Sequence, residues 1–354
     1  MGIIAKQSIQ GTIVTYLGVA VGFVTTFFVL TRFLTAEEIG LARVLVDAAT
    51  LFIGLAQLGT SSSIIRFYPH FRSQEQGTKS QDDHGFFFWT LIIPLVGFAL
   101  FTAIYCACHE PLSRWFGEKS PLFVEYYYMV LPMAFFMLYQ TIFETNANVR
   151  MHIVVPRAVR ELITRIGLLI AYLLYAFQIV GINGFVIALC GVYAVAMLCN
   201  MGYLFSLGNI SLRPDWEFLR NNRSLVRQYL LYTGFLLISA VASVLAPTLS
   251  SFFITAEMGL NYTGIFAIAT YIAVMVSIPY RSMTAIASPQ LATAIKENNQ
   301  QETAHLMQQV SNTLLLIGGI ILCVIWLNID LIFHILPNGE TYASARQVVL
   351  ILGT

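Results

Sequence analysis

The chain has 354 residues, of which 57% are hydrophobic and only 10% are charged. Soluble domains carry about 25% charged residues, so this composition excludes a cytosolic enzyme, a secreted disulfide scaffold and a disordered chain. The net charge is +1, from 19 bases and 18 acids, and no bulk basicity points to a nucleic-acid partner. The composition therefore predicts an all-α polytopic membrane protein.

Apolar stretches long enough to cross a membrane, about 20 residues each, recur along the chain. Predicted spans precede a polar stretch at residues 207–227 and lie near 9–34, 44–67, 86–108, 122–147, 158–180 and 182–206. Further spans follow near 229–254, 260–283 and 309–333, and another apolar run begins at Val348. We expect an N-terminal lobe at 1–206, a cytoplasmic inter-lobe loop at 207–228 and a partial C-terminal lobe at 229–354.

The distribution of bases predicts the orientation in the membrane. With the N-terminus in the cytoplasm, 14 of the 19 bases fall on the cytoplasmic side and 5 on the other, whereas the 18 acids divide nine to nine. A bias in bases but not in acids is typical of the positive-inside rule. We therefore expect a multi-pass protein with a cytoplasmic N-terminus.

A short string near the start of the chain recurs after the polar stretch. Residues 35–41 read TAEEIGL and residues 255–260 read TAEMGL, the same string with one residue missing, and Pro69 and Pro289 share the 220-residue offset. Both strings are expected in outer loops between helices of matching length. The repeat predicts two parallel lobes with the substrate path between them. A second lobe matching the first would add two helices beyond Thr354.

Ionisable residues inside or beside the spans are candidate functional groups, because a charge at mid-bilayer costs about 2.5–3.5 kcal/mol or more. Arg43 and Asp47 stand four residues apart and can neutralise each other. They form either a pair at the outer interface or a pair that gates the cavity. Asp330, with Asn328 and His334 nearby, is a candidate for ion coupling, and an exposed loop boundary is the alternative.

Other polar residues are candidates for substrate binding. Arg66 and Arg281 close corresponding helices of the two lobes, where they anchor at the headgroups or face each other and bind a diphosphate through the guanidinium fork. Arg32 lies near the outer end of the first span, where an interfacial role is the alternative to substrate binding. Glu144 and Asn148 lie near the inner end of the fourth span, and such a polar group rarely faces lipid.

A basic stretch follows the fourth predicted span and contains Arg150, Arg157, Arg160 and Arg165. Contact with anionic lipid headgroups, worth about 1 kcal/mol per base, explains such a stretch. The alternative is that it attracts a polyprenyl-diphosphate substrate to the inner mouth of the transport path.

Sequence signatures of catalysis do not occur in the chain. It has no Walker A motif, GxSxG elbow or HExxH helix, and the longest polar stretch is too short to form a catalytic domain. We expect a protein that is not an enzyme and that uses neither a cofactor nor a metal.

The N-terminal region resembles one family of transporters. Gln10-Gly11, residues 33–41 (FLTAEEIGL), Leu58-Gly59 and residues 66–69 (RFYP) are similar to the start of bacterial polysaccharide exporters. These are Wzx-type flippases of the multidrug/oligosaccharidyl-lipid/polysaccharide (MOP) superfamily. The resemblance implies two six-helix lobes around a V-shaped cavity that opens alternately to each side of the membrane.

The resemblance also implies a function. It is the flipping of a polyprenyl-diphosphate-linked oligosaccharide across the bacterial inner membrane, for O-antigen or capsule export. The implied partners are the lipid-linked oligosaccharide, membrane lipids, and a polysaccharide polymerase or glycosyltransferases. The alternatives are a multidrug exporter or lipid II flippase of the same superfamily, and a non-transporting scaffold of a polysaccharide-assembly complex.

Overall fold

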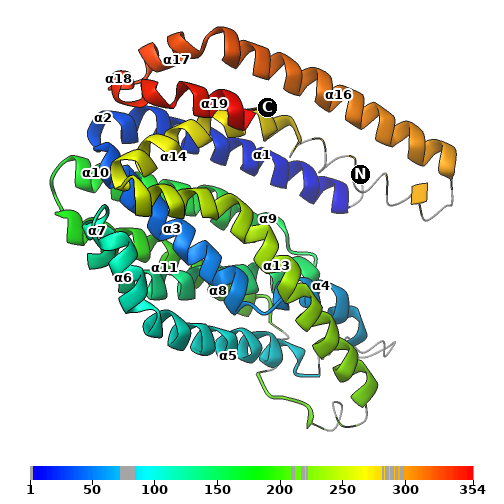
Figure 1. The fold of residues 1–354 in the computed structure, drawn as a ribbon. Helices are drawn as coiled ribbons and strands as arrows, with labels where there is room; N and C mark the ends of the chain where they lie inside the picture. The colour runs from blue at the N-terminus through cyan, green and yellow to red at the C-terminus, as the bar shows by residue number, and fades with distance from the viewer. Residues whose placement is uncertain are drawn as a thin grey trace.

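The computed structural model describes residues 3–71, 84–208, 212–216, 220, 222–280, 283, 287, 291, 294–295 and 299–353. These residues form helices and short connections, with no strand among them (Figure 1). Six of the described helices are long and apolar enough to cross a membrane. The protein is therefore an all-α, multi-pass membrane protein, as the composition predicts.

The first two spans differ in detail from their predicted boundaries. α1 (Ile3–Val24), the π-helical η1 (Thr25–Leu30) and α2 (Thr31–Phe33) form the first span. α3 (Ala36–Ala56) begins earlier than expected, because Thr35 and Glu38 form a capping box. The predicted span at 44–67 is wrong as one helix, since a turn with positive φ at Leu58 and Gly59 separates α3 from α4 (Thr60–Phe71).

The remaining helices follow in chain order. The N-terminal half continues with α5 (Phe86–Ala107), α6 (His109–Gly117), α7 (Pro121–Glu125), η2 (Tyr127–Met129), α8 (Val130–Val149), α9 (Val154–Ala158), η3 (Val159–Ile163), α10 (Thr164–Ala176) and α11 (Ile182–Ser206). The C-terminal half contains α13 (Arg223–Glu257), α14 (Leu260–Val274), η4 (Met275–Ser277), α16 (Gln300–Leu327), α17 (Ile329–Ile335), α18 (Gly339–Tyr342), η5 (Ala343–Ala345) and α19 (Arg346–Gly353).

The repeated string does not occupy equivalent places in the two halves. Residues 35–41 contain the cap and first turns of α3, whereas residues 255–257 are the last residues of α13. The expectation that both strings are loops is therefore wrong. The equivalent helices are α3 and α14, which begin at Ala36 and Leu260, so the structural offset between them is 224 residues and not 220.

Helices α3 and α14 cross through two glycines at this same offset, Gly40 and Gly264. A Cβ atom on Gly40 would overlap the carbonyl oxygen of Leu260, and one on Gly264 would overlap the carbonyl oxygen of Ala36. The contact is reciprocal, because each glycine meets the first residue of the partner helix. Such small residues let transmembrane backbones approach closely. A reciprocal contact between equivalent helices is expected of two parallel lobes related by a two-fold axis.

One end of the bundle is closed by contacts between the two halves. We call it the outer end, following the predicted topology; it lies at the left of Figure 1, where α5 and α13 end. There Ser120 Oγ donates to the carbonyl oxygen of Thr255 at 2.6 Å, and Trp115 Nε1 donates to Glu257 Oε1 at 3.2 Å. Asn338 Nδ2 donates to the carbonyl oxygen of Thr31 at 2.9 Å. The halves are therefore joined here by hydrogen bonds as well as by the glycine crossing.

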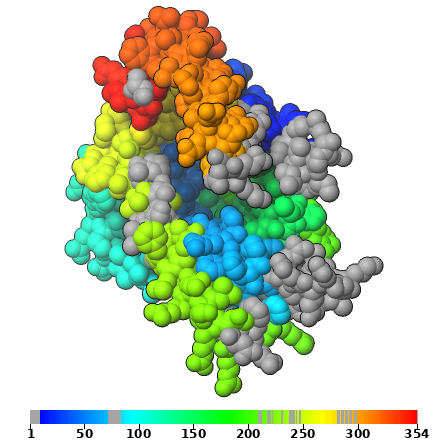
Figure 2. Space-filling model, turned by 90° about the vertical axis from the view of Figure 1, so that its right-hand side faces the viewer, coloured from blue at the N-terminus to red at the C-terminus, as the bar shows by residue number. Residues whose placement is uncertain are grey.

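The opposite, inner end is where α1, α5, α13 and α16 begin, and Figure 2 looks onto it. α13 packs along α3 and α4, with Gly54 against Val244 and a buried hydrogen bond of 2.8 Å between Ser63 Oγ and Thr233 Oγ1. In Figure 2 the orange α16 lies above the light-blue α4 and the yellow-green start of α13. The glycines of α1 instead face α9, η3 and α10.

Replacing Gly264 with alanine tests the crossing. The new Cβ has to displace the Ala36 carbonyl, and overpacking of this kind costs about 1–3 kcal/mol, against a gain of about 1 kcal/mol in helix propensity. We expect a lower unfolding temperature in detergent micelles. The matched control is Gly191→Ala on α11, where a Cβ would meet no atom within 4 Å. Equal unfolding temperatures for the two variants would show that the crossing is not tight.

Candidate functional site

A cavity of about 600 Å³ lies between helices of the two halves. One wall comes from α1 and η1, a second from α9, η3 and α10, and a third from α14 and η4. The lining residues that carry polar groups are Thr12, Thr15, Tyr16, Thr25, Thr26, Arg157, Arg160, Glu161, Arg165, Tyr172 and Tyr271. The position between the two halves is the place where the repeat predicts the substrate path.

Glycines on α1 make room for charged side chains of the second wall. Gly18 lies against the backbone of Glu161, and a Cβ on Gly22 would overlap the guanidinium of Arg165. Gly11, seven residues before Gly18 on the same face, lies against the guanidinium of Arg157. The small residues of α1 therefore let arginine side chains lie flat on the helix instead of facing lipid.

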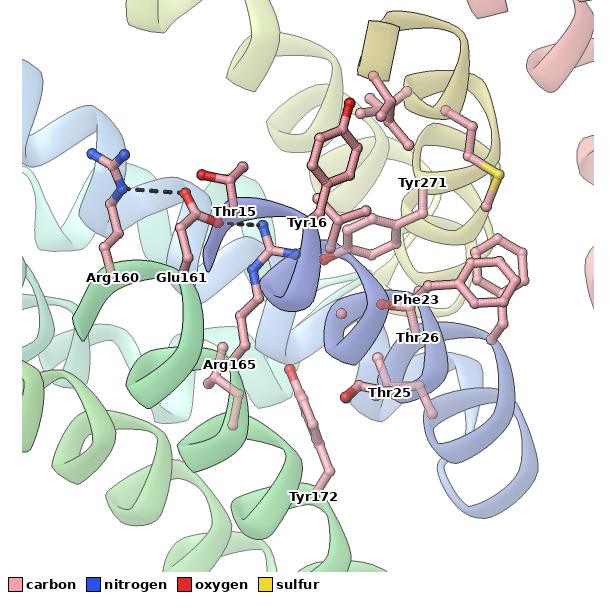
Figure 3. Close-up of a pocket in the computed structure, with 18 of the residues that line it drawn as sticks. Thr15, Tyr16, Phe23, Thr25, Thr26, Arg160, Glu161, Arg165, Tyr172 and Tyr271 are labelled. Atoms are coloured by element: carbon pink, nitrogen blue, oxygen red, sulfur yellow. Dashed lines mark hydrogen bonds and ion pairs between the residues drawn. The ribbon is translucent and has the colours of Figure 1, made fainter. Parts of the chain in front are cut away.

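The charged groups of the cavity form a chain of contacts (Figure 3). Arg165 Nη2 donates to Glu161 Oε2 at 2.9 Å, and its Nη1 donates to the carbonyl oxygen of Gly18 at 2.7 Å. Arg160 Nη1 donates to Glu144 Oε1 at 2.7 Å, and its Nε lies 3.4 Å from Glu161 Oε1. Arg157 has no ion-pair partner among the described residues. The lining thus has three arginines and one glutamate, an excess of positive charge.

Hydroxyl groups and aromatic rings complete the lining. Figure 3 shows Tyr16, Tyr172 and Tyr271 projecting from three different helices, α1, α10 and α14. Thr25 and Thr26 add hydroxyls from η1. Aromatic faces with nearby hydroxyls and guanidinium groups can contact the apolar faces and the hydroxyls of a sugar.

Two π-helical segments contribute to the lining, η1 in the first wall and η3 in the second. Their wider turns change the direction in which neighbouring side chains project, and π-helical turns are frequent at functional sites. Neither segment contains a proline, and Pro156 stands three residues before η3, in α9.

A buried ion pair lies next to the cavity. Arg43 Nε and Asp47 Oδ2 on α3 are 2.8 Å apart, and both side chains are largely buried. The guanidinium carbon of Arg43 lies 5.8 Å from the ring centre of Tyr271, a cavity residue on α14. Asp47 and Tyr271 each follow their crossing glycine by seven residues, about two turns. The pair therefore links the α3–α14 contact to the cavity wall.

The other predicted residues differ in their distance from the cavity. Glu144 is buried and contacts the cavity arginine Arg160, and the side-chain oxygen of Asn148 is buried without a hydrogen-bond partner among the described residues. Arg32 is exposed over Phe33. Asp330 is exposed and pairs with Arg346 at 2.9 Å. Neither Arg32 nor Asp330 lines the cavity.

The predicted clamp of Arg66 and Arg281 gains no support from the cavity. Arg66 is exposed, with its guanidinium carbon 4.2 Å from the ring centre of Tyr232, and it does not line the cavity. Arg281 lies outside the described residues. The sequence instead supplies the cavity charges from the basic stretch, whose Arg157, Glu161 and Arg165 recur every four residues. That spacing places them on one helical face and was the signal available in the sequence.

The described residues contain no group of three or more histidine, cysteine, aspartate or glutamate side chains that could hold a metal ion. The polar groups that line the cavity are guanidinium, carboxylate and hydroxyl groups.

Comparisons with known proteins agree with this architecture. A family model described as "Polysaccharide biosynthesis protein" matches residues 4–293. A search of curated protein sequences finds no match.

Among solved structures, a MATE transporter in complex with MaL6 aligns at a TM-score of 0.65 and 16% identity, over 100% of this chain and 79% of that chain. A point mutant of the Vibrio cholerae MATE transporter VcmN aligns at 0.63 and 16% identity, over 100% and 82%. VcmN in the bent form aligns at a TM-score of 0.61 and 16% identity, over 100% of this chain and 82% of that chain.

Proposed function

The chain belongs to the polysaccharide biosynthesis protein family, and we propose that it flips a polyprenyl-diphosphate-linked oligosaccharide between the leaflets of the bacterial inner membrane. Both the family and the fold are those of MOP-superfamily transporters. The observation that carries the substrate proposal is the excess of arginine in a cavity between the two halves. In this proposal the N-terminus is cytoplasmic and the cavity loads at the inner end.

The arginines suit the diphosphate. Guanidinium groups bind phosphate oxygens with paired, charge-assisted hydrogen bonds, each worth about 1.5–3 kcal/mol. Arg157 lacks an ion-pair partner among the described residues, and the half-exposed Arg160 can exchange Glu144 or Glu161 for a phosphate. Arg165 is held by Gly18 and Glu161, so it has a structural part in fixing α1 against α10.

The remaining lining suits the two other parts of such a substrate. The tyrosines and threonines offer hydroxyls and ring faces to a sugar head. Apolar cavity residues with exposed side chains, Phe23 on α1 and Val274 on α14, offer a surface for the first isoprene units, while the rest of the tail stays in the bilayer. The tail therefore need not cross a polar path.

Movement of the head across the membrane requires the closed outer end to open. Alternating access in two-lobed transporters is a rigid-body movement of one lobe against the other. The α3–α14 crossing lies on the boundary between the halves, and we assign the Arg43–Asp47 pair beside it a gating role. Substrate that contacts Tyr271 would alter the wall on which Arg43 packs.

A multidrug exporter is less consistent with the lining. A cavity for cationic compounds needs acidic groups, whereas Glu161 is the only acid lining this cavity among the described residues and it is already paired with Arg165. The likeness to MATE structures, at 16% identity, is a likeness of fold.

Substrate binding provides a test that does not depend on transport. The purified full-length protein is titrated with a fluorescent polyprenyl-diphosphate oligosaccharide and with the matching neutral polyprenyl oligosaccharide that lacks the diphosphate. We expect the diphosphate compound to bind at least about tenfold more tightly, which corresponds to about 1.4 kcal/mol. Equal binding of the two compounds would contradict recognition through the arginines, and tighter binding of a lipophilic cation would favour the drug exporter.

A further inference from the structure

A second basic site lies at the inner end, away from the transport cavity. A groove of about 820 Å³ is lined by Trp89 of α5 and by residues of the inter-lobe segment and α13: Trp216, Arg220, Arg223, Val226, Arg227 and Leu231. It shares no residue with the transport cavity, whose walls come from other helices. The proposed transport function does not use it.

The three arginines of the groove are exposed and have no ion-pair partner among the described residues. Asp215, the described acid beside Trp216, is engaged by His84 Nδ1 at 3.0 Å. Arg223 is also the first residue of α13, where positive charge is unfavourable because the helix dipole is positive at its N-terminus. An anion in the groove would neutralise the arginines and would also interact favourably with the positive end of the α13 dipole.

Two indoles also line the groove. The rings of Trp89 and Trp216 pack edge to face, with centroids 5.4 Å apart and planes at 88°. The Trp89 Nε1 atom is buried and has no hydrogen-bond partner among the described residues. Indoles are enriched at the membrane interface, where the ring meets hydrocarbon and the N–H end meets the headgroups.

The face of α13 that carries the arginines changes from basic to apolar along its length. Arg223, Arg227, Leu231 and Phe235 recur every four residues, and the two apolar side chains are exposed. From Arg227 to Phe235 the helix rises about 12 Å, at 1.5 Å per residue. A soluble anion would not contact the apolar part of this face. A lipid would contact both parts, because its charged headgroup is followed by acyl chains.

We propose that this groove binds an anionic phospholipid. The phosphate lies against Arg223 and Arg227, the headgroup contacts Arg220 and the indole pair, and an acyl chain runs along Leu231 and Phe235. The bound lipid joins the start of α13 to the start of α5, and therefore one half of the protein to the other.

Native mass spectrometry of the full-length protein in detergent tests the proposal, with phosphatidylglycerol and phosphatidylcholine added at equal concentration. We expect retained phosphatidylglycerol on the unmodified protein and a strong reduction in the Arg223→Gln/Arg227→Gln variant, by about fivefold for each arginine. The matched control is Arg114→Gln, an exposed arginine at the outer end that pairs only loosely with Glu110 at 3.7 Å. It should retain the lipid fully.

Other outcomes would overturn the proposal. These are equal retention of the two lipids by the unmodified protein, equal loss of lipid in the double variant and the Arg114→Gln control, and displacement of phosphatidylglycerol by millimolar inorganic phosphate, which would identify a soluble-anion site. Thermal unfolding of each variant without added lipid establishes that the double variant is folded, so that loss of lipid is not mistaken for loss of structure.

Discussion

Replacing Asp47 with asparagine is expected to lower the free energy of unfolding by about 3–5 kcal/mol. Asp47 is 7% exposed and its carboxylate lies 2.8 Å from Arg43 Nε, within the α3 span. The substitution keeps the size of the side chain and removes its charge, which leaves the Arg43 guanidinium largely buried and unpaired. Thermal or denaturant unfolding in detergent micelles measures the loss.

The matched control for this prediction is Asp330→Asn, which removes one partner of the exposed pair with Arg346. An exposed ion pair contributes about 0–1 kcal/mol, so this variant should unfold close to the unmodified protein. The double variant Arg43→Met/Asp47→Leu removes both charges and should recover most of the stability. Similar unfolding of Asp47→Asn and Asp330→Asn would mean that water reaches the α3 pair, and the gating proposal would lose its basis.

Replacing Arg157 and Arg160 together with alanine is expected to lower binding of the diphosphate-linked oligosaccharide by about 10²-fold or more. Each lost charge-assisted hydrogen bond costs about 1.5–3 kcal/mol, which is about tenfold or more per arginine. The loss of stability should be smaller than in Asp47→Asn. The buried Glu144 loses its partner Arg160, but a carboxylate can take up a proton whereas a guanidinium cannot lose one, and Arg165 keeps its contacts with Glu161 and Gly18. Equilibrium binding to the purified protein measures the effect.

Two further variants identify the reason for any loss. Arg157→Lys/Arg160→Lys keeps the charge without the planar fork, so intermediate binding indicates bidentate contact with phosphate. Arg66→Ala removes an arginine that packs on Tyr232 outside the cavity, and it should bind as the unmodified protein does. Loss of binding in Arg66→Ala with normal binding in the cavity variant would favour the clamp predicted from the sequence.

The architecture could be predicted from the sequence because each span is a long apolar segment that needs no partner to be recognised. The membrane class follows from composition. The two parallel lobes were predicted from a repeated string that ends α13 instead of starting α14, so the string did not identify the true correspondence of α3 with α14. The boundaries at α3 could not be found by hydropathy, because Glu37 and Glu38 make the start of this helix polar while Thr35 caps it. The turn at Leu58 and Gly59 divides a continuous run of moderate hydropathy, and only the backbone shows it.

Less of the candidate site can be predicted from the sequence, for a physical reason. Charges inside spans point to Arg43, Asp47 and Glu144, which lie at or near the cavity wall. The cavity arginines, however, come from a segment that hydropathy assigns to a loop and the start of a span. They are brought inward because Gly11, Gly18 and Gly22 leave space on α1, a complementarity between segments about 145 residues apart. A single sequence contains no direct sign of such pairing.

Transbilayer movement of a fluorescent polyprenyl-diphosphate oligosaccharide tests the proposed activity most directly. The full-length protein is reconstituted into liposomes, and the fraction of label that becomes accessible to an impermeant quencher is followed over time. We expect faster exchange than in protein-free liposomes, abolished in Arg157→Ala/Arg160→Ala and unchanged in Arg66→Ala. Exchange no faster than in protein-free liposomes, under any imposed ion gradient, would contradict the flippase proposal and favour a drug exporter or a non-transporting scaffold.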